Sequence, residues 1–149
     1  MIRSEIVLTI PGTPVPKGSL VCTRGPRHAL REDNAKTKPW RERVTAAARQ
    51  IQQRPDQNQP LDVEITFTFD RPKSTKRELP AVKPDVDKLV RTILDALEDA
   101  EVLVNDSQVV DLAARKRYAR YGDQMTEAHD DALPYPGVRI RINPICQPH

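Results

Sequence analysis

The sequence predicts one α+β domain, a mixed β-sheet packed against two main helices in the order β-α-β-α-β-β. Segments near 39–51 and 85–98 repeat apolar residues at helical spacing, whereas four others alternate apolar and polar residues like β-strands. A length of 149 residues with 38% apolar content is enough for one core, so we expect residues 1–149 to form a single domain.

The first half of the chain is expected to form strand, helix and strand. Residues 5–10 alternate as a strand, and the prolines and glycines of 11–18 indicate a loop. Pro39 opens a helix, where its missing amide hydrogen does no harm. We interpret Trp40 in that helix as a core anchor rather than a platform for stacking bases. Residues 61–69 alternate throughout and predict a strand with one buried and one wet face.

The second half is expected to add a helix and two strands. From Val86 the apolar residues recur with a period of three and four, which predicts a helix over 85–98. Residues 107–118 read as a strand that places Lys116 on the same face as Asp106. We expect a loop over 122–137, a closing strand over 138–142 and a frayed tail after it.

The charge pattern suits a polyanionic partner without requiring one. The net charge is +3 and the isoelectric point is near 9.0, with basic residues concentrated in 17–38 and again in 71–83. Either segment could contact phosphates or could be a solvated loop. No segment approaches 18 consecutive apolar residues and no signal peptide is visible, so we expect a cytoplasmic protein without a membrane span.

Two carboxylates stand at the start of the second helix. Pro84 suits the approach to a helix, and Asp85 is a good N-cap residue. At 100° per residue, Asp87, Arg91 and Asp95 fall on one flank of this helix, beside its apolar stripe.

Asp106 is a candidate for a third carboxylate at the same place. The helix covers roughly 20 Å at about 1.5 Å per residue. The eight steps from Glu98 to Asp106 cover at most roughly 26 Å at about 3.3 Å each. An extended segment 102–104 running back along the helix would therefore just bring Asp106 to Asp85 and Asp87. Three clustered carboxylates need a cation, and oxygen ligands alone favour Mg²⁺ or Mn²⁺.

Each acid also has a structural interpretation. Asp85 could serve only as a helix cap, and Asp87 could form a minor surface ion pair with Arg91 four residues on. Asp106 could serve only to stabilise a turn through its own backbone.

The pattern of these acids resembles the RusA family of Holliday-junction resolvases. The matching residues are Asp85-Val86-Asp87-Lys88-Leu89, Asp95-Ala96-Leu97 and Asp106-Ser107-Gln108-Val109-Val110-Asp111, together with the proline- and glycine-rich opening at 10–18. The resemblance implies a small, Mg²⁺-dependent, homodimeric endonuclease that cuts branched DNA.

The resemblance also implies roles for individual residues. Asp85, Asp87 and Asp106 would be the metal ligands and would be catalytic together with Arg91, which stands where the family has a lysine. Arginine keeps the positive charge of that lysine but does not give up a proton. Asn105 replaces the first of two adjacent aspartates. Basic residues expected to contact DNA are Lys17, Arg24, Lys73, Lys76, Lys83, Lys88, Lys116 and Arg117.

Two other functions are compatible with the sequence. The protein could bind junctions without cutting them, with Arg91 and Asn105 as the departures from the family pattern. It could instead apply the same chemistry to flaps or forks, since no motif records the shape of the DNA that is cut.

Overall fold

The computed structural model describes residues 4–18, 20–22, 30–32, 35–120 and 131–146. Its elements follow one another as β1 (Ile6–Pro11), β2 (Leu20–Cys22), β3 (Leu30–Glu32), α1 (Thr37–Ala48), β4 (Leu61–Phe69), α2 (Val86–Asp99), η1 (a 3₁₀ turn, Asp106–Gln108), β5 (Val109–Tyr118) and β6 (Gly137–Pro144). Apart from the short pair β2–β3, which the sequence did not predict, the main elements confirm the order β-α-β-α-β-β.

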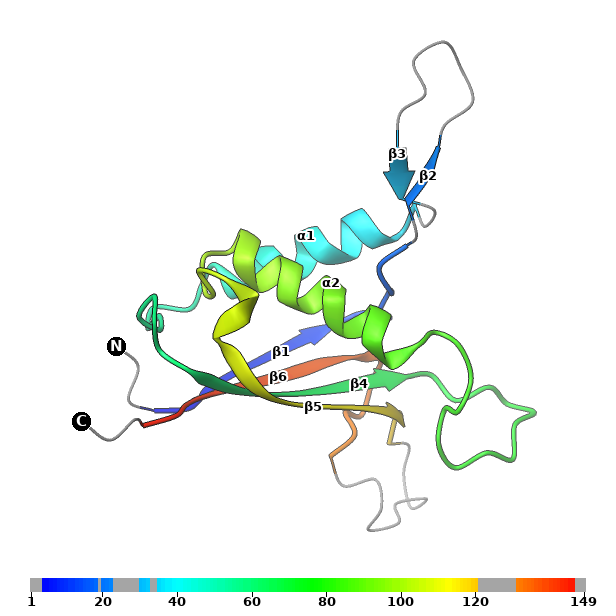
Figure 1. Cartoon of the computed structure of the whole chain (residues 1–149). Coiled ribbons are helices and arrows are strands. Elements are labelled where there is room, and N and C mark those ends of the chain that lie inside the picture. Colours follow the sequence, from blue (N-terminus) through cyan, green and yellow to red (C-terminus); the bar gives the residue numbers. More distant parts are fainter. Residues whose placement is uncertain (1–3, 19, 23–29, 33–34, 121–130, 147–149) are drawn as a thin grey trace.

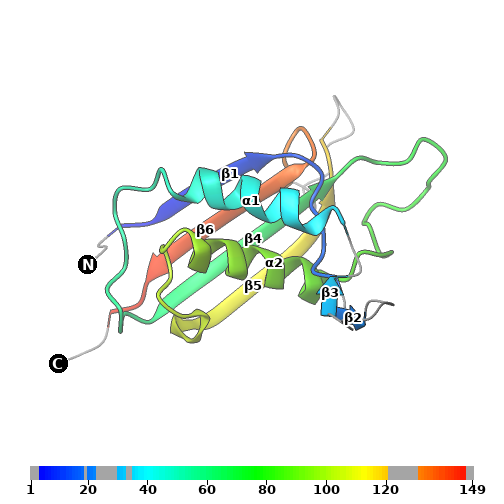
Figure 2. The same cartoon turned by 90° about the horizontal axis from the view of Figure 1, so that it is seen from above.

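The main sheet has the strand order β1-β6-β4-β5. The pairs β1·β6 and β6·β4 are antiparallel, whereas β4·β5 is parallel. A parallel pair needs a crossover connection, and here α2 supplies it between β4 and β5. Both helices cover the same face of the sheet (Figures 1 and 2), and β5 is left at one edge. The start of α2 therefore lies near the C-terminal ends of β4 and β5.

The core fills the space between the sheet and the helices. The buried apolar residues of β4 (Leu61, Val63, Ile65 and Phe67) meet those of α2 (Leu89, Ile93 and Leu97). These are the residues that the two periodicities predicted to face inward. Trp40 is 5% exposed within the same core, which confirms its interpretation as an anchor.

The expectation of a wet outer face on β4 is wrong at its C-terminal end. Thr66 and Thr68 point to that face, yet they are buried. The segment before β6 lies against them, because Ala132 and Leu133 are buried and the Leu133 amide donates to Thr68 Oγ1 at 3.1 Å. Towards the start of the strand, Asp62 and Glu64 remain partly exposed, as expected.

Other expectations differ at the ends of elements. The tail expected to fray after 142 still belongs to β6 through Pro144. Arg24, most of the loop expected over 122–137 and the last three residues lie outside the described residues. Within the described ranges, no helix is long and apolar enough to cross a lipid bilayer.

Candidate nuclease site

Asp85 stands at the N-cap of α2 without acting as a cap. Its backbone is extended (φ −70°, ψ 137°), and its side chain makes no capping hydrogen bond. Its nearest cationic partner is Lys88, with an Nζ–Oδ2 distance of 3.9 Å, at an exposed position. The structural interpretation of Asp85 as a helix cap is therefore wrong, and its carboxylate faces solvent with no strong intramolecular contact.

Asp87 and Arg91 are both exposed on α2 and do not pair with each other. Among the described residues, neither side chain forms an ion pair within 4.0 Å or a hydrogen bond. The surface ion pair that the four-residue spacing allows is absent here. Asp95, which we expected on the same flank, instead turns towards α1. Among the described residues, the start of α2 thus offers the Asp87 carboxylate and the Arg91 guanidinium without partners, beside an Asp85 carboxylate whose one ion pair is the 3.9 Å contact with Lys88.

Asp106 lies at the opposite end of α2, so the expectation that it returns to Asp85 and Asp87 is wrong. The Asp106 amide donates to Glu98 Oε1 at 2.8 Å, and Glu98 is in the last turn of the helix. The reason is that 102–104 does not run back along α2. Val102 and Leu103 are buried at the end of the helix, and the backbone amides of both residues donate to the Leu97 carbonyl.

The separation excludes a shared metal ion within one copy of the chain. Glu98 is eleven positions after Asp87, about 16 Å further along the helix, and Asp106 lies beside Glu98. A Mg²⁺ ion takes its ligands at about 2.1 Å, so ligands of one ion lie within a few ångströms of each other. In agreement, the described part of the chain contains no cluster of three His, Cys, Asp or Glu side chains suited to a metal.

The Asp106 carboxylate is exposed and makes no hydrogen bond to another described residue. The neighbouring residues form the hydrogen bonds that stabilise this turn. Asn105 caps η1, accepting from the Ser107 amide at 2.8 Å. Asparagine and aspartate cap equally well, so Asn105 fits this position. The interpretation of Asp106 as a turn stabiliser is therefore wrong.

A groove with lysines lies beside Asp85. Its volume is about 500 Å³, and it runs between the loop after β1 and the start of α2. Its lining includes Lys36, Lys83 and Lys88 as well as Asp85. Sequence reasoning missed Lys36, although it falls within the basic segment 17–38. Three ammonium groups beside one carboxylate can hold phosphate groups near that acid.

Lys116 lies at the same end of the molecule, near Asp85. Its Nζ donates to the carbonyl oxygens of Val82 (2.5 Å) and Pro84 (2.8 Å), which fixes the chain just before α2. Partial burial lowers the pKa of Lys116, and the negative charge of Asp85 acts in the opposite direction. Lys116 thus positions the Asp85 segment.

The remaining basic residues nominated from the sequence differ in availability. Lys73 and Lys76 are exposed on the loop between β4 and α2, where Lys76 and Arg77 border a hollow of about 570 Å³. Arg117 is 20% exposed and pairs with Asp131 at 2.8 Å, so its charge is already compensated.

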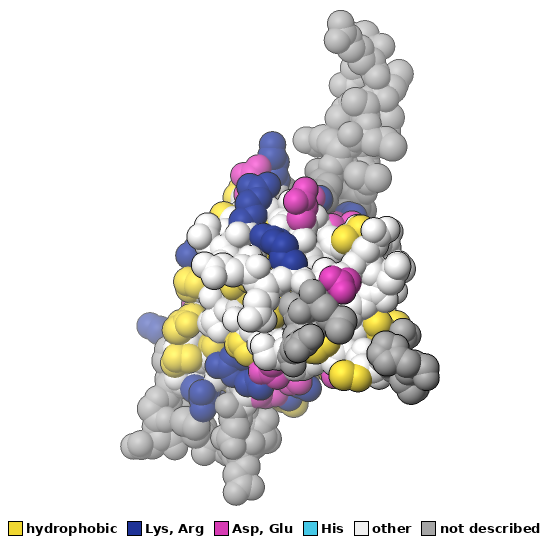
Figure 3. Space-filling view, turned by 90° about the vertical axis from the view of Figure 1, so that its left-hand side faces the viewer, with side chains coloured by type: hydrophobic (Ala, Val, Ile, Leu, Met, Phe, Trp, Pro, Cys, Tyr) yellow, Lys and Arg dark blue, Asp and Glu magenta, His cyan; other side chains and the backbone are white. Residues whose placement is uncertain are grey.

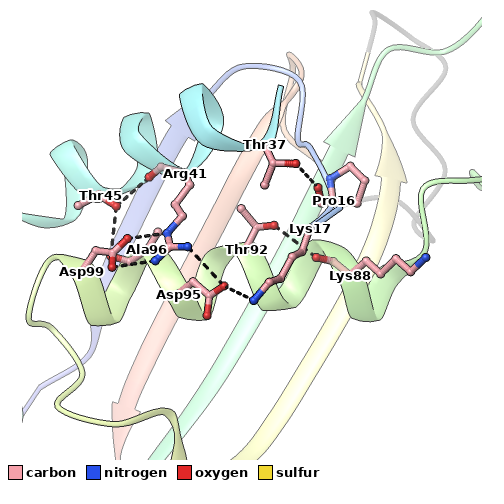
Figure 4. Close-up of polar contacts among 10 residues, drawn as sticks. All are labelled: Pro16, Lys17, Thr37, Arg41, Thr45, Lys88, Thr92, Asp95, Ala96 and Asp99. Atoms are coloured by element: carbon pink, nitrogen blue, oxygen red, sulfur yellow. Dashed lines mark hydrogen bonds and ion pairs between the residues drawn. The ribbon is translucent and has the colours of Figure 1, made fainter. Parts of the chain in front are cut away.

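Lys17 is likewise engaged within the protein. Its Nζ lies 3.1 Å from Asp95 Oδ2, and its backbone amide donates to the Lys88 carbonyl (Figure 4). These contacts hold the loop after β1 against α2 and so form one wall of the groove. Asp95, which the sequence placed on the acidic flank, is an anchor for this loop.

A second contact fixes α1 against α2. Arg41 donates to Asp99 through Nε (2.6 Å) and Nη2 (2.9 Å), as Figure 4 shows. The hydrogen bonds from Arg41 hold the pKa of Asp99 below its ordinary value, against the effect of partial burial. The helix that carries Asp85 and Asp87 is therefore held along its α1 side.

The opposite end of the molecule has a different surface. Figure 3 views the end where the termini and the end of α2 lie, and there basic and acidic side chains lie close to each other. The lysine-lined groove lies at the other end of α2, beside Asp85.

A comparison with models of protein families shows to which family the chain belongs. The family model of endodeoxyribonuclease RusA matches residues 11–124, which is most of the chain. The match runs from the loop that walls the groove through α2 to β5. A comparison with curated proteins gives no match. The chain belongs to the RusA family of Holliday-junction resolvases, which are endodeoxyribonucleases that act on DNA.

Proposed function

We propose that this protein resolves four-way DNA junctions as a homodimer by paired, symmetric, Mg²⁺-dependent nicks, with Asp85, Asp87 and Asp106 as the metal ligands. The observation that carries the proposal is the pair Asp85 and Asp87 at the start of α2: both residues are exposed, and Asp85 lines a groove that three lysines also line. Mn²⁺ is expected to substitute for Mg²⁺, because both ions accept oxygen ligands.

The proposed ligands suit such an ion chemically. All three offer carboxylate oxygens, the ligands that Mg²⁺ prefers, and none is engaged in a strong contact with another described residue. When bound, the metal lowers the pKa of a water molecule and offsets charge on the leaving oxygen. The carboxylates would fix the position of this ion, and that position would decide where the DNA strand is cut.

The basic residues are proposed to bind and orient the DNA. Lys36, Lys83 and Lys88 in the groove would hold phosphates beside Asp85. Lys73 and Lys76 on the neighbouring loop would extend this contact along the strand. Arg91, one turn after Asp87, would stabilise the extra negative charge of the transition state, and its permanent charge suits this role.

A nicking assay tests the proposal. A labelled four-way junction is incubated with Mg²⁺ or with EDTA, beside matched flap, fork and linear duplexes. We expect paired nicks at symmetry-related positions on the junction, and none in EDTA. Preferential cutting of flaps or forks would contradict junction resolution, and cutting that persists in EDTA would contradict the metal.

Single substitutions test the residues. Asp85→Asn, Asp87→Asn and Asp106→Asn should each reduce the cutting rate by at least about 10³-fold and leave junction binding within a few-fold. Asp111→Asn, an exposed aspartate on β5, is the matched control and should cut normally. Normal cutting by one of the first three variants would remove that residue from the site.

A further inference from the structure

The groove beside Asp85 has an apolar part that the proposed phosphate contacts do not use. Besides its three lysines and Asp85, the groove is lined by Thr13, Pro14, Val15, Pro16, Phe69 and Pro84. All of these except Thr13 are apolar, and apolar side chains offer nothing to a phosphate. Given the proposed function, on which this inference rests, we propose that this part of the groove binds one unstacked nucleobase of the strand to be cut.

Phe69 supplies an aromatic surface at the end of β4. It falls on the same face of the sheet as the buried Phe67, two residues earlier. Phe69 packs against the core, yet it is only half-buried and lines the groove, so part of its side chain is open to a ligand. Its carbonyl accepts from the Ala119 amide at 2.8 Å, which fixes the end of the strand. A fixed aromatic side chain with one open side can stack on a nucleobase.

The proline-rich loop after β1 supplies a second wall. Pro14 is buried and Val15 and Pro16 are half-buried, so this loop is packed onto the body of the protein. Thr37 Oγ1 donates to the Pro16 carbonyl at 2.8 Å (Figure 4), and the contacts of Lys17 tie the loop to α2. Because proline has a fixed φ, such a wall loses little conformational freedom when a ligand binds.

The lysines give the groove a preference for a nucleotide over an apolar ligand. The Lys83 side chain forms no ion pair or hydrogen bond with another described residue. The Lys88 side chain makes only the 3.9 Å contact with Asp85 within the described ranges. An apolar peptide would leave these ammonium groups without partners, whereas a nucleotide carries a phosphate beside its base. A nucleotide therefore suits both parts of the lining.

The size and position of the groove favour a single unstacked base. A volume of about 500 Å³ is typical of a site for one small ligand. In a duplex the faces of each base are covered by its neighbours, so a base can enter such a site only after it has left the stack. Asp85 belongs to this groove and to the proposed metal site, so the bound base would lie next to the phosphate that is cut.

Base binding of this kind would make the shape of the DNA part of its recognition. Unstacking a base costs free energy, and the cost is lowest where the base is unpaired. Bases at the point where strands exchange have fewer stacked neighbours than bases within an arm of the junction, so they leave the stack more easily. A linear duplex offers no such base. The groove would therefore favour branched DNA over duplex DNA.

Binding measured in EDTA tests the inference, because it requires no cutting. Single bases around the exchange point of a junction are replaced in turn by an abasic tetrahydrofuran, at both symmetry-related positions. At one such pair of positions we expect the Kd of wild type to rise about five- to 100-fold, because the stacking contact is missing. Removing the complementary base instead leaves the bound base unpaired and should lower the Kd. A Kd that changes at no position overturns the inference.

Phe69→Leu is the matched variant, since leucine keeps an apolar side chain and removes the aromatic face. It should bind the unmodified junction at least about fivefold more weakly and should no longer respond to the abasic position. Tyr135→Leu removes an aromatic side chain that is 40% exposed outside the lining of the groove, and it should bind as wild type does. Both variants should retain the circular dichroism of wild type. Equal abasic responses in wild type and Phe69→Leu would contradict the proposal.

Photo-crosslinking locates the base directly. A 5-iododeoxyuridine is placed at the position that the abasic series identifies, and the irradiated complex is digested and analysed by mass spectrometry. We expect the crosslink on Phe69 or on the loop 13–16. A crosslink found only outside the groove would refute this site for the base.

The outcomes separate this inference from the proposed function. Wild type that cuts junctions with Mg²⁺ but shows no abasic response refutes the base site alone. Wild type that shows the Phe69-dependent response but cuts no junction refutes the proposed function and leaves the base site in place. If wild type binds no junction, the abasic series is placed in a single-stranded oligonucleotide. Equal affinities of wild type and Phe69→Leu for that oligonucleotide overturn the inference, and a weaker affinity of the variant supports it.

Discussion

Gln108 fixes the segment that carries Asp106, and its replacement gives a quantitative test of the fold. Its side chain is 7% exposed and makes four hydrogen bonds. Oε1 accepts from the amides of Val104 (2.9 Å) and Asn105 (3.4 Å). Nε2 donates to the carbonyls of Asp56 (2.8 Å) and Gln59 (3.2 Å). Gln108 therefore connects the segment that follows α2 to the turn before β4.

The expected cost of Gln108→Ala follows from these four contacts. A neutral hydrogen bond contributes about 1 kcal/mol net, and the two shorter contacts should carry most of the effect. Because water can reach part of the vacated space, we expect the free energy of unfolding to fall by about 2–3 kcal/mol. For a chain of this size, that corresponds to a melting temperature lowered by about 6–9 °C.

Urea unfolding followed by circular dichroism measures this change, with Gln57→Ala as the matched control. Gln57 is an exposed residue of the same turn, so its replacement should change the free energy of unfolding by less than about 0.5 kcal/mol. Gln108→Ala should also slow junction cutting, because the Asp106 segment loses its anchor. A loss of stability no larger than that of the control would refute the role assigned to Gln108.

Gln108→Glu separates the two halves of the contact. The introduced carboxylate still accepts from both amides but, when charged, cannot donate to the two carbonyls. Those carbonyls should raise its pKa in the folded state above the unfolded value of about 4.3. Since the unfolded state then binds fewer protons, stability relative to wild type should fall as pH rises from about 4 to 7. A difference that does not depend on pH would contradict this reasoning.

Two further predictions concern groups with shifted pKa values. Arg41 lowers the pKa of Asp99 below its ordinary value of 3.8, so the pair stabilises the fold above that pH, and the contribution is lost as pH falls through the folded pKa. Asp99→Asn should therefore lower the free energy of unfolding by less than about 1 kcal/mol at pH 7, because the pair is partly exposed. The difference from wild type should vanish when urea unfolding is measured near pH 2. Burial lowers the pKa of Lys116 in the folded state, so the unfolded state holds the ammonium proton more tightly. The free energy of unfolding of wild type should therefore rise relative to that of Lys116→Met as pH approaches 10.5. Urea unfolding between pH 7 and 10.5 measures this change, and a relative loss of stability over that range would refute it.

The sequence was sufficient for the regular elements because each has a strong local pattern. The apolar stripe of α2 and the alternation in β4 are each several residues long, and the core faces they predict are the observed ones. The burial of Thr66 and Thr68 could not be predicted from the sequence, because it depends on Leu133, more than sixty residues away. The pair between Lys17 and Asp95 is of the same kind, since it joins a loop to a helix 78 residues further on.

The position of Asp106 shows the limit of reasoning from reach alone. Eight extended steps could span the helix, but maximum reach only bounds where a residue can be. The chain after α2 is instead decided by burial, since Val102 and Leu103 are 1% exposed against the core. Glu101 makes the necessary turn with φ of 61°, a conformation that no helix or strand pattern predicts. The same apolar residues that suggested a returning strand therefore end the helix.

The length of α2 keeps Asp106 apart from Asp85 and Asp87 within one chain. Asp87 and Glu98 are fixed about 16 Å apart by the rise of an α-helix, and Lys116 and Gln108 hold the segments at its two ends. No rotation of side chains can bring Asp106 to Asp85 across this length. The reach of the chain could not reveal this separation, because the rise of the helix and the burial of Val102 and Leu103 decide where Asp106 lies.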